Sequence, residues 1–155
     1  MNVELNRDWL CRKFQEIKLR TVKALDQLTD EEVNASPDPS SHSISALILH
    51  IHGNVQERIL KGILQQEADR GNPWKPAYMT CAELVHYIQT DMDTVIRAVN
   101  SLKPEQWLHT QTVRNRERTH LDMLHQCAAH YSEHMGQILY LTKWLRKEQY
   151  KSTSI

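Results

Sequence analysis

Two histidines four residues apart stand in the longest periodic stretch of the sequence, which runs from Thr119 to Gln149. Its apolar residues recur at steps of three and four, which predicts a helix with one buried face. Residues four apart lie one above the other on a helix, so His130 and His134 should point together toward the interior. Burying two imidazoles is costly unless something pairs with them. A divalent metal is the simplest partner, and polar groups across a helix interface are the alternative.

A third histidine borders the apolar face of another predicted helix. His50 lies three residues after Leu47 and beside its stripe, whereas His52 points to the other side and cannot easily share a metal with His50. Three neutral imidazoles with an open coordination position are the arrangement that zinc enzymes use to activate water. The candidate metal ligands are therefore His50, His130 and His134, and the pattern assigns no catalytic residue.

The ligand types leave the metal and its coordination partly open. Nickel, iron and cobalt accept imidazole nitrogens as zinc does, and affinity order alone does not choose among them. Cys127 lies three residues before His130 and is a candidate fourth ligand, although the role of a small apolar core residue suits it better. The other histidines are expected at the surface or at helix caps: His42, His86, His109, His120 and His125.

Two other metal motifs overlap or neighbour these residues. The segment 130–134 fits H-x-x-E-H, the pattern of inverted zinc peptidases, with Glu133 as general base. The chain is too small, however, for a peptidase cleft with its own substrate-binding sheet. Glu83–His86 and Glu117–His120 match the E-x-x-H pairs of di-iron bundles. The second pair lies in a charged segment at the start of a helix, where a buried di-metal centre does not fit.

Hydrophobic periodicity predicts the elements that must position these side chains. A capping box at Thr29 predicts a short helical turn after the first helix, and another at Thr80 begins the third. Four such helices with long inter-helix connections predict an all-α four-helix bundle, with residues 1–150 as one domain and residues 151–155 as a flexible tail. The predicted helices span 3–28, 43–67, 80–102 and 119–149, and the connections span 34–41, 68–79 (with Pro73, Trp74 and Pro76) and 108–118.

Composition narrows the classes of partner. The chain has 155 residues, of which 19 are basic and 19 acidic, so no global field recruits nucleic acid or an anionic membrane. No apolar run approaches the roughly 20 residues that span a bilayer. The first eight residues lack the apolar core of a signal peptide. The three cysteines are widely spaced, which favours reduced thiols. We therefore expect a cytoplasmic protein that binds neither nucleic acid nor membrane.

Two segments resemble the signatures of a known family. The stretch 43–54, Ser-Ile-Ser-Ala-Leu-Ile-Leu-His-Ile-His-Gly-Asn, looks like the second-helix signature of the DinB-like (YfiT-like) four-helix bundle superfamily. The stretch 130–138 looks like its fourth-helix signature, and the Leu-x-x-Glu-Glu turn at Leu28 also matches. The resemblance implies the DinB-like bundle, a homodimer, and a divalent metal, usually nickel or zinc, on His50, His130 and His134.

The resemblance also implies a class of chemistry. Characterised members include transferases that join a low-molecular-weight thiol such as bacillithiol to a substrate, and a metal would hold such a thiol as thiolate by lowering its pKa. The function expected is thus a metal-dependent enzyme, a thiol S-transferase or a hydrolase, acting on a small molecule. The alternative is a non-enzymatic bundle in which the metal has a structural or stress-related role. The residues whose part in either case stays open are Asn54, Glu57, Arg114, Arg116, Arg118, Glu133 and Gln137.

Overall fold

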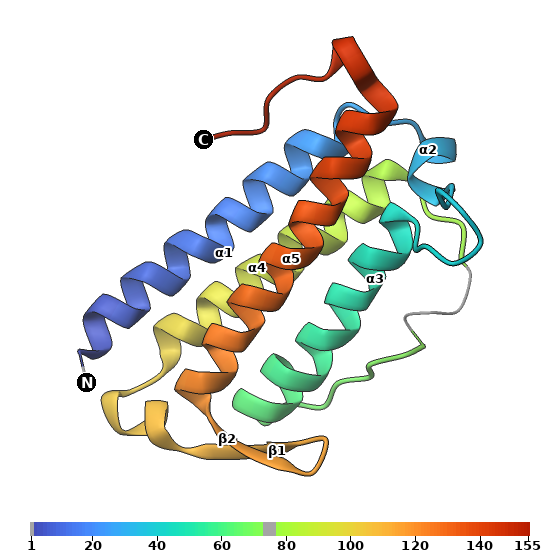
Figure 1. Ribbon diagram of the computed structural model, residues 1–155. Coiled ribbons are helices and arrows are strands. Elements are labelled where there is room, and N and C mark those ends of the chain that lie inside the picture. The colour runs from blue at the N-terminus through green and yellow to red at the C-terminus, as the bar shows by residue number, and fades with distance from the viewer. Residues whose placement is uncertain (1, 73–76) are drawn as a thin grey trace.

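Four long helices pack lengthwise in the computed structural model, which describes residues 2–72 and 77–155 (Figure 1). α1 contacts α4 and α5, and α3 contacts the same two helices from the other side. α1 and α5 run in one direction, whereas α3 and α4 run in the opposite one. The all-α four-helix bundle predicted from the sequence is confirmed. The four long helices are α1 (Val3–Leu25), α3 (Ile44–Val55), α4 (Cys81–Ser101) and α5 (His120–Arg146).

Side-chain caps begin each of these helices. The side chain of Ser43 accepts from the amide of Ala46 at the start of α3, and that of Thr119 accepts from Asp122 at the start of α5. The capping boxes predicted at Thr29 and Thr80 are both present, and the first of them starts α2 (Asp30–Asn34). Each cap satisfies backbone amides that have no partner inside the helix, so these residues set where a helix begins.

The apolar stripes of the four helices meet in one core. Most of the apolar residues recurring at steps of three and four are buried, and Leu28, Leu121 and Leu145 are partly buried at its edge, which shows that the helical period was read in the correct phase. Tyr131 and Trp107 are the largest side chains in this core. Representative members from the four helices are Leu10, Phe14 and Ile17, then Ile48 and Ile51, then Leu84, Ile88 and Val95, and finally Met123 and Ile138.

The second predicted helix differs from the observed one in its geometry. It was expected as one continuous α-helix over 43–67, but α3 ends at Val55 and continues as the π-helix η1 (Gln56–Ile63). The amide of Leu64 reaches the carbonyl of Ile59, which is the wider i→i+5 pattern. Periodicity alone does not report this change. The first helix also ends earlier than predicted, at Leu25.

The segment 108–118, expected as an irregular polar connection, contains a β-hairpin. Its strands β1 (Thr110–Val113) and β2 (Arg116–Thr119) pair antiparallel at the end of the bundle (Figure 1). Each strand has four residues, and Gln111 in β1 is the only one of the eight that is buried, so the sequence shows no apolar alternation that would predict the hairpin. Two short 3₁₀ segments, η2 (Pro104–Leu108) and η3 (Lys147–Gln149), complete the described elements. Pro73, Trp74 and Pro76 lie outside the described residues.

The last five residues, which we expected to form a flexible tail, lie along α1. Thr153 is 1% exposed, and its hydroxyl accepts from Arg20. The side chain of Gln27 donates to the carbonyl of Lys151 and accepts from its amide. Paired backbone and side-chain hydrogen bonds of this kind fix the segment on the surface of α1.

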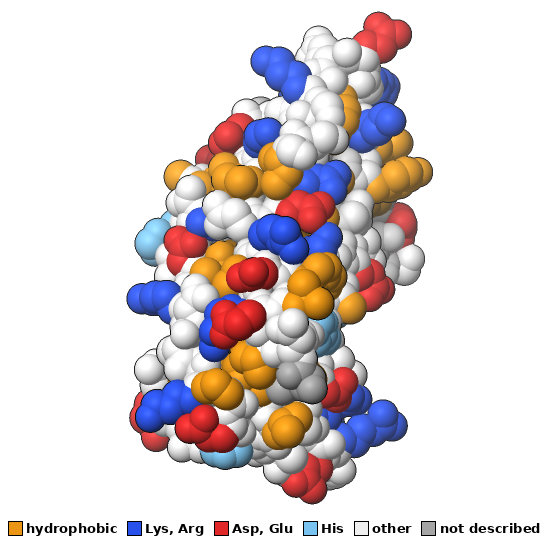
Figure 2. Space-filling view, turned by 90° about the vertical axis from the view of Figure 1, so that its left-hand side faces the viewer, with side chains coloured by type: hydrophobic (Ala, Val, Ile, Leu, Met, Phe, Trp, Pro, Cys, Tyr) orange, Lys and Arg blue, Asp and Glu red, His pale blue; other side chains and the backbone are white. Residues whose placement is uncertain are grey.

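The surface carries mixed charge. On the face that Figure 2 shows, acidic and basic side chains alternate, with hydrophobic side chains between them. No helix within the described part of the chain is long and apolar enough to cross a membrane.

The capping box of α4 should contribute measurably to stability. The Thr80 hydroxyl accepts from the amide of Glu83, whose carboxylate accepts from the Thr80 amide and hydroxyl. Replacing Thr80 by Ala is expected to lower the free energy of unfolding by about 1 kcal/mol, measured by urea titration. Thr90→Ala, an exposed change within the same helix, serves as control and should cost nothing, because Ala is the better helix former. Equal losses in both variants would contradict this.

Candidate metal centre

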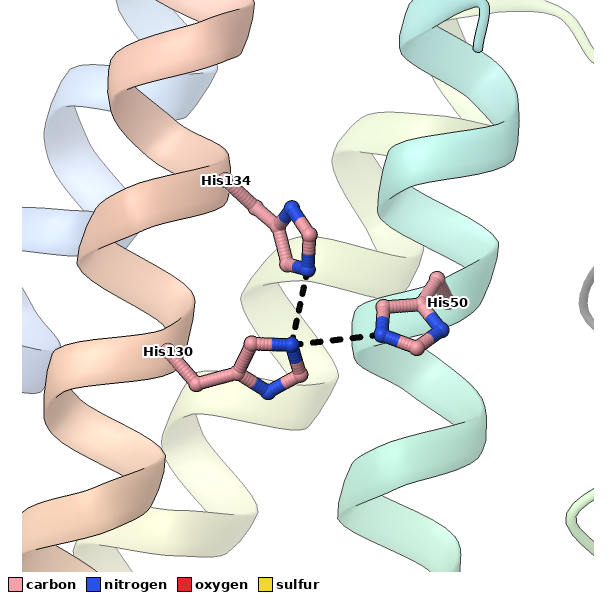
Figure 3. A group of neighbouring side chains, drawn as sticks. All are labelled: His50, His130 and His134. Atoms are coloured by element: carbon pink, nitrogen blue, oxygen red, sulfur yellow. Dashed lines mark hydrogen bonds between the residues drawn. The ribbon is translucent and has the colours of Figure 1, made fainter.

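Three imidazoles converge between α3 and α5. Figure 3 shows His50 on α3 pointing toward His130 and His134, which lie one turn apart on α5. The Nε2 atoms of His50 and His130 are 3.3 Å apart, and those of His130 and His134 are 2.8 Å apart. One nitrogen from each residue lies within 4.8 Å of the other two, and no other residue that the structure describes joins this group. The structure therefore brings together the three candidate ligands that the sequence singled out.

The ring nitrogens of this cluster fit a metal better than they fit one another. Ligand bonds of about 2.0–2.1 Å at a tetrahedral ion place neighbouring nitrogens about 3.4 Å apart. The observed 3.3 Å matches this spacing, and the 2.8 Å contact needs a small ring movement. In the neutral form, each imidazole offers one lone pair and one N–H. Three Nε2 atoms that face a common point can all direct their lone pairs at one cation. They cannot all bind one shared proton in this way.

Burial keeps two of the three imidazoles neutral. Desolvation lowers the pKa of His50 to about 4, and the neighbouring charges of His134 and His130 lower it further. Desolvation likewise lowers the pKa of His130 to about 4, with His134 and Arg58 as additional causes. A neutral imidazole is the form that binds metal. These two candidate ligands would therefore bind a metal at neutral pH without first losing a proton.

One hydrogen bond orients the third imidazole. The Nδ1 of His134 donates to the side-chain oxygen of Gln137, 2.7 Å away on the next turn of α5. A proton held on Nδ1 leaves the lone pair on Nε2, which faces the other two histidines. Gln137, one of the residues whose role the sequence left open, therefore sets the tautomer of a candidate ligand.

A buried polar contact holds the two helices in register beside this cluster. The hydroxyl of Tyr131 donates to the side-chain oxygen of Asn54 at 3.0 Å, and both residues are buried. Asn54 is one turn beyond His50, and Tyr131 follows His130 directly. The contact therefore sets the distance across which the imidazoles meet. Tyr131 belongs to the apolar stripe of the segment 119–149, and the period alone does not predict its polar contact.

A cavity of about 390 Å³ opens next to the histidines. It provides space for a small molecule beside His50 and His130. Glu133 contributes the only carboxylate among the described residues that line it. Of the three arginines singled out in the sequence, Arg114 lines the cavity, whereas Arg118 pairs with Asp122 at 2.7 Å. The full lining is His50, Arg58, Arg114, Gln126, Ala129, His130 and Glu133.

The sequence analysis missed Arg58 as a site residue. Its spacing gave a signal, because His50, Asn54 and Arg58 follow one another at steps of four and so share a helix face. Glu57, whose role the sequence left open, does not line the cavity. Its carboxylate forms an ion pair with Arg70 at 3.0 Å.

Other candidate ligands are placed elsewhere. Cys127 is fully buried, which raises the pKa of its thiol, and it is not part of the three-histidine group. It is therefore a core residue. His52, expected to point away from His50, lies 2.9 Å through Nδ1 from a carboxylate oxygen of Asp91 on α4. This placement agrees with the prediction that His50 and His52 do not share a metal.

The weaker metal motifs are not assembled as centres. Glu83 caps α4, and Glu117 accepts a hydrogen bond from Thr110 across the hairpin. Neither E-x-x-H pair belongs to a group of possible metal ligands among the described residues, which agrees with the expectation that a di-iron centre does not fit. The only sheet within the described residues is the two-stranded hairpin, which offers no peptidase-like substrate sheet. His120 was expected at the surface or as a cap, but it is 5% exposed.

Comparison with known proteins agrees with the fold. A family model described as a protein of unknown function, DUF1572, matches residues 5–155. No curated protein is significantly similar to the chain in sequence.

Solved structures of several bacterial proteins share the fold at low sequence identity. A DinB-like protein from Bacillus cereus has a TM-score of 0.71 and 16% identity, with 88% of this chain and 90% of that chain covered. A DinB-like protein from Bacillus subtilis has a TM-score of 0.69 and 15% identity, covering 94% and 97%. A conserved protein from Enterococcus faecalis has a TM-score of 0.67 and 17% identity, covering 92% and 96%. The DinB-like architecture that the sequence suggested is thus confirmed.

The lowered pKa values of His50 and His130 predict how stability depends on pH in the metal-free protein. Both groups have a pKa of about 4 when folded, against an ordinary value of 6.5. Between these values the unfolded chain binds more protons, so the free energy of unfolding should rise with pH from about 4 to 6.5 and then level off. Urea titrations of chelator-treated protein from pH 5 to pH 7 measure this slope. His50→Gln should make it shallower, and an unchanged slope would contradict the assignment.

The Tyr131–Asn54 contact predicts a loss of stability when the hydroxyl is removed. Tyr131→Phe leaves the buried Asn54 oxygen without its donor, which should lower the free energy of unfolding by about 1–3 kcal/mol. Tyr140→Phe is the matched control, because Tyr140 lies on the same helix and is 73% exposed. Urea denaturation compares the two. A loss in the control as large as in Tyr131→Phe would show that the buried contact is not the cause.

Proposed function

We propose that this chain, which belongs to the DUF1572 family of proteins of unknown function and has the DinB-like fold, is a metal-dependent enzyme. The observation that carries the proposal is the convergence of three histidine Nε2 atoms beside a cavity. His50, His130 and His134 would hold a divalent ion. The absence of a fourth protein ligand among the described residues supports a site with open coordination positions.

The chemistry follows from such a site. A divalent ion held by three neutral imidazoles lowers the pKa of a bound water or thiol, so that it becomes a nucleophile at neutral pH. Zinc and nickel are the metals that we propose, because both bind imidazole nitrogen well. Glu133 lines the cavity beside His130 and is placed to accept the proton that such a nucleophile loses.

The reaction that we propose is the transfer of a low-molecular-weight thiol of the bacillithiol type, with hydrolysis as the other possibility. Both reactions need an activated nucleophile and a small substrate, and a cavity of about 390 Å³ suits a small molecule. The main rival is a metal that only ties α3 to α5. The space beside His50 and His130 favours the enzymatic function, because a purely structural ion is normally enclosed by four protein ligands.

Assembly and location complete the proposal. We propose a homodimer, supported by Tyr140 and Trp144, which lie one turn apart on α5 and are 73% and 56% exposed. Large exposed aromatic side chains on one helix face are typical of association surfaces. A cytoplasmic location is supported by the free thiols of Cys11, Cys81 and Cys127, which persist in reducing compartments.

Removing one candidate ligand should abolish both metal binding and activity. His134→Ala leaves two imidazoles, so protein purified without a metal-affinity tag should lose most of the roughly one equivalent of metal expected in the wild type. Elemental analysis measures the metal, and thiol transfer from bacillithiol to a chromogenic electrophile measures turnover.

His86→Ala is the matched control, because His86 is exposed on α4 and outside the cluster. It should keep both the metal and the turnover. Turnover that persists in metal-free His134→Ala would overturn the enzymatic proposal. If His134→Ala loses the metal but the wild type shows no turnover in these assays, the structural role is favoured instead.

A further inference from the structure

The cavity beside the histidines contains two positive charges that the proposed metal chemistry does not use. Arg58 and Arg114 line it together with His50 and His130. Among residues 2–72 and 77–155, neither arginine forms an ion pair with a carboxylate, whereas Arg70 and Arg118 nearby do. Unpaired guanidinium groups in a cavity are available to a ligand, and their planar fork matches a carboxylate or a phosphate.

Arg58 reaches the cavity from the π-helix. Its Nε is buried and has no hydrogen-bond partner in the described part of the protein. The guanidinium also interacts with the buried Cys127 thiol, so part of the side chain is held in the core, while the half-buried residue as a whole lines the cavity. π-Helical turns are frequent at functional sites because they displace side chains from regular helical positions. Arg58 thus presents a donor group two turns along from His50.

Arg114 reaches the same cavity from the turn of the hairpin. Arg114 and Asn115 have φ values of 50° and 61°, the left-handed backbone that a two-residue type I′ turn requires at both central positions. Asn suits this conformation, whereas a long side chain such as Arg is disfavoured there. The turn would be more stable with Asn at position 114. Its arginine therefore points to a role other than forming the turn.

The hairpin is docked so that the two arginines face one cavity. The side-chain amide of Gln111, which is 9% exposed, donates to the backbone carbonyl of Arg58 at 3.3 Å. Gly62 makes this approach possible, because a Cβ atom at that position would clash with the Gln111 side chain. The absence of a side chain at Gly62 thus leaves room for Gln111, whose hydrogen bond to the Arg58 carbonyl holds β1 against η1.

We propose that Arg58 and Arg114 form a subsite for the anionic group, a carboxylate or a phosphate, of a small substrate. The inference rests on the proposed function for the identity of the reacting end, which would lie at the three histidines. The two guanidinium charges exceed the single negative charge of Glu133 in this cavity, so the lining favours an anion. The volume of about 390 Å³ restricts the ligand to a small molecule.

The test uses the 155-residue chain labelled with ¹⁵N, with inorganic phosphate and succinate as separate probes. Saturable shifts of the Arg58 Nε–H signal and of the Arg114 amide are expected with at least one probe in metal-free protein. The probe that binds more tightly identifies the anionic group. Arg58→Met and Arg114→Asn should each weaken this binding at least tenfold.

A neighbouring arginine provides the control. Arg116 is exposed on β2 and does not line the cavity, so Arg116→Asn should leave the affinity within about twofold of the wild type. Arg114→Asn should not lower the midpoint of thermal unfolding, because Asn adopts the left-handed turn readily. This result separates a binding role from a structural one even if Arg58→Met folds poorly.

Two results would overturn the subsite. One is the absence of saturable shifts with both probes, and the other is equal weakening by Arg114→Asn and Arg116→Asn. His134→Ala separates this inference from the proposed function, because it should lose the metal yet still bind the anion. If the wild type binds metal and shows turnover but binds neither probe, the proposed metal function is retained and the proposed subsite is wrong.

Discussion

The packing of α3 against α5 is the constraint on which the candidate site depends. Two helices that meet through apolar stripes would bury polar groups at a cost, yet this interface contains Asn54, Tyr131, one histidine from α3 and two from α5. The Tyr131–Asn54 hydrogen bond satisfies one pair and fixes how far the helices slide past each other. The imidazoles are then left facing a common point. A small shift along either helix would separate them, because adjacent residues on a helix differ by 1.5 Å in rise.

The end of the bundle nearest this interface departs most from regular helical structure. The π-helix η1 and the hairpin lie against each other there, and Gln111 connects them. Irregular elements of this kind are less stable than continuous helices, so their presence beside the histidines suggests that position matters more than stability. The rest of the bundle is regular, with capped helices around a continuous apolar core. That rigid frame gives the irregular segments a fixed base.

The low identity to proteins of the same fold has a physical explanation. A helical bundle needs apolar residues at the correct spacing and suitable caps, and many sequences meet both needs. Identities of 15–17% at TM-scores of 0.67–0.71 are consistent with this tolerance. The fold therefore says little about activity, which depends on the side chains placed at the α3–α5 interface and around its cavity.

Local patterns in the sequence determined the helices and the candidate ligands. The period of three and four gave the buried faces, the capping residues gave the starts of the helices, and His130 and His134 share a face because they are four residues apart. His50 came from its position beside the stripe of a second helix. These features depend on neighbours within one or two turns, which is why one chain read by itself contains them.

Only the tertiary structure decided the features that depend on distant contacts. Periodicity does not reveal the π-helix, because the sequence contains the same apolar residues whether the turns are α-helical or wider. The packing around the segment decides between the two. The hairpin has strands too short and too polar to show alternation, and its docking includes the packing of Gln111 against Gly62, about fifty residues earlier in the chain. Arg58 and Arg114 line one cavity, and Asn54 is hydrogen-bonded to Tyr131, because of how the helices and the hairpin are arranged. Which helices are neighbours is set by the packing of the whole core, and no local spacing encodes it.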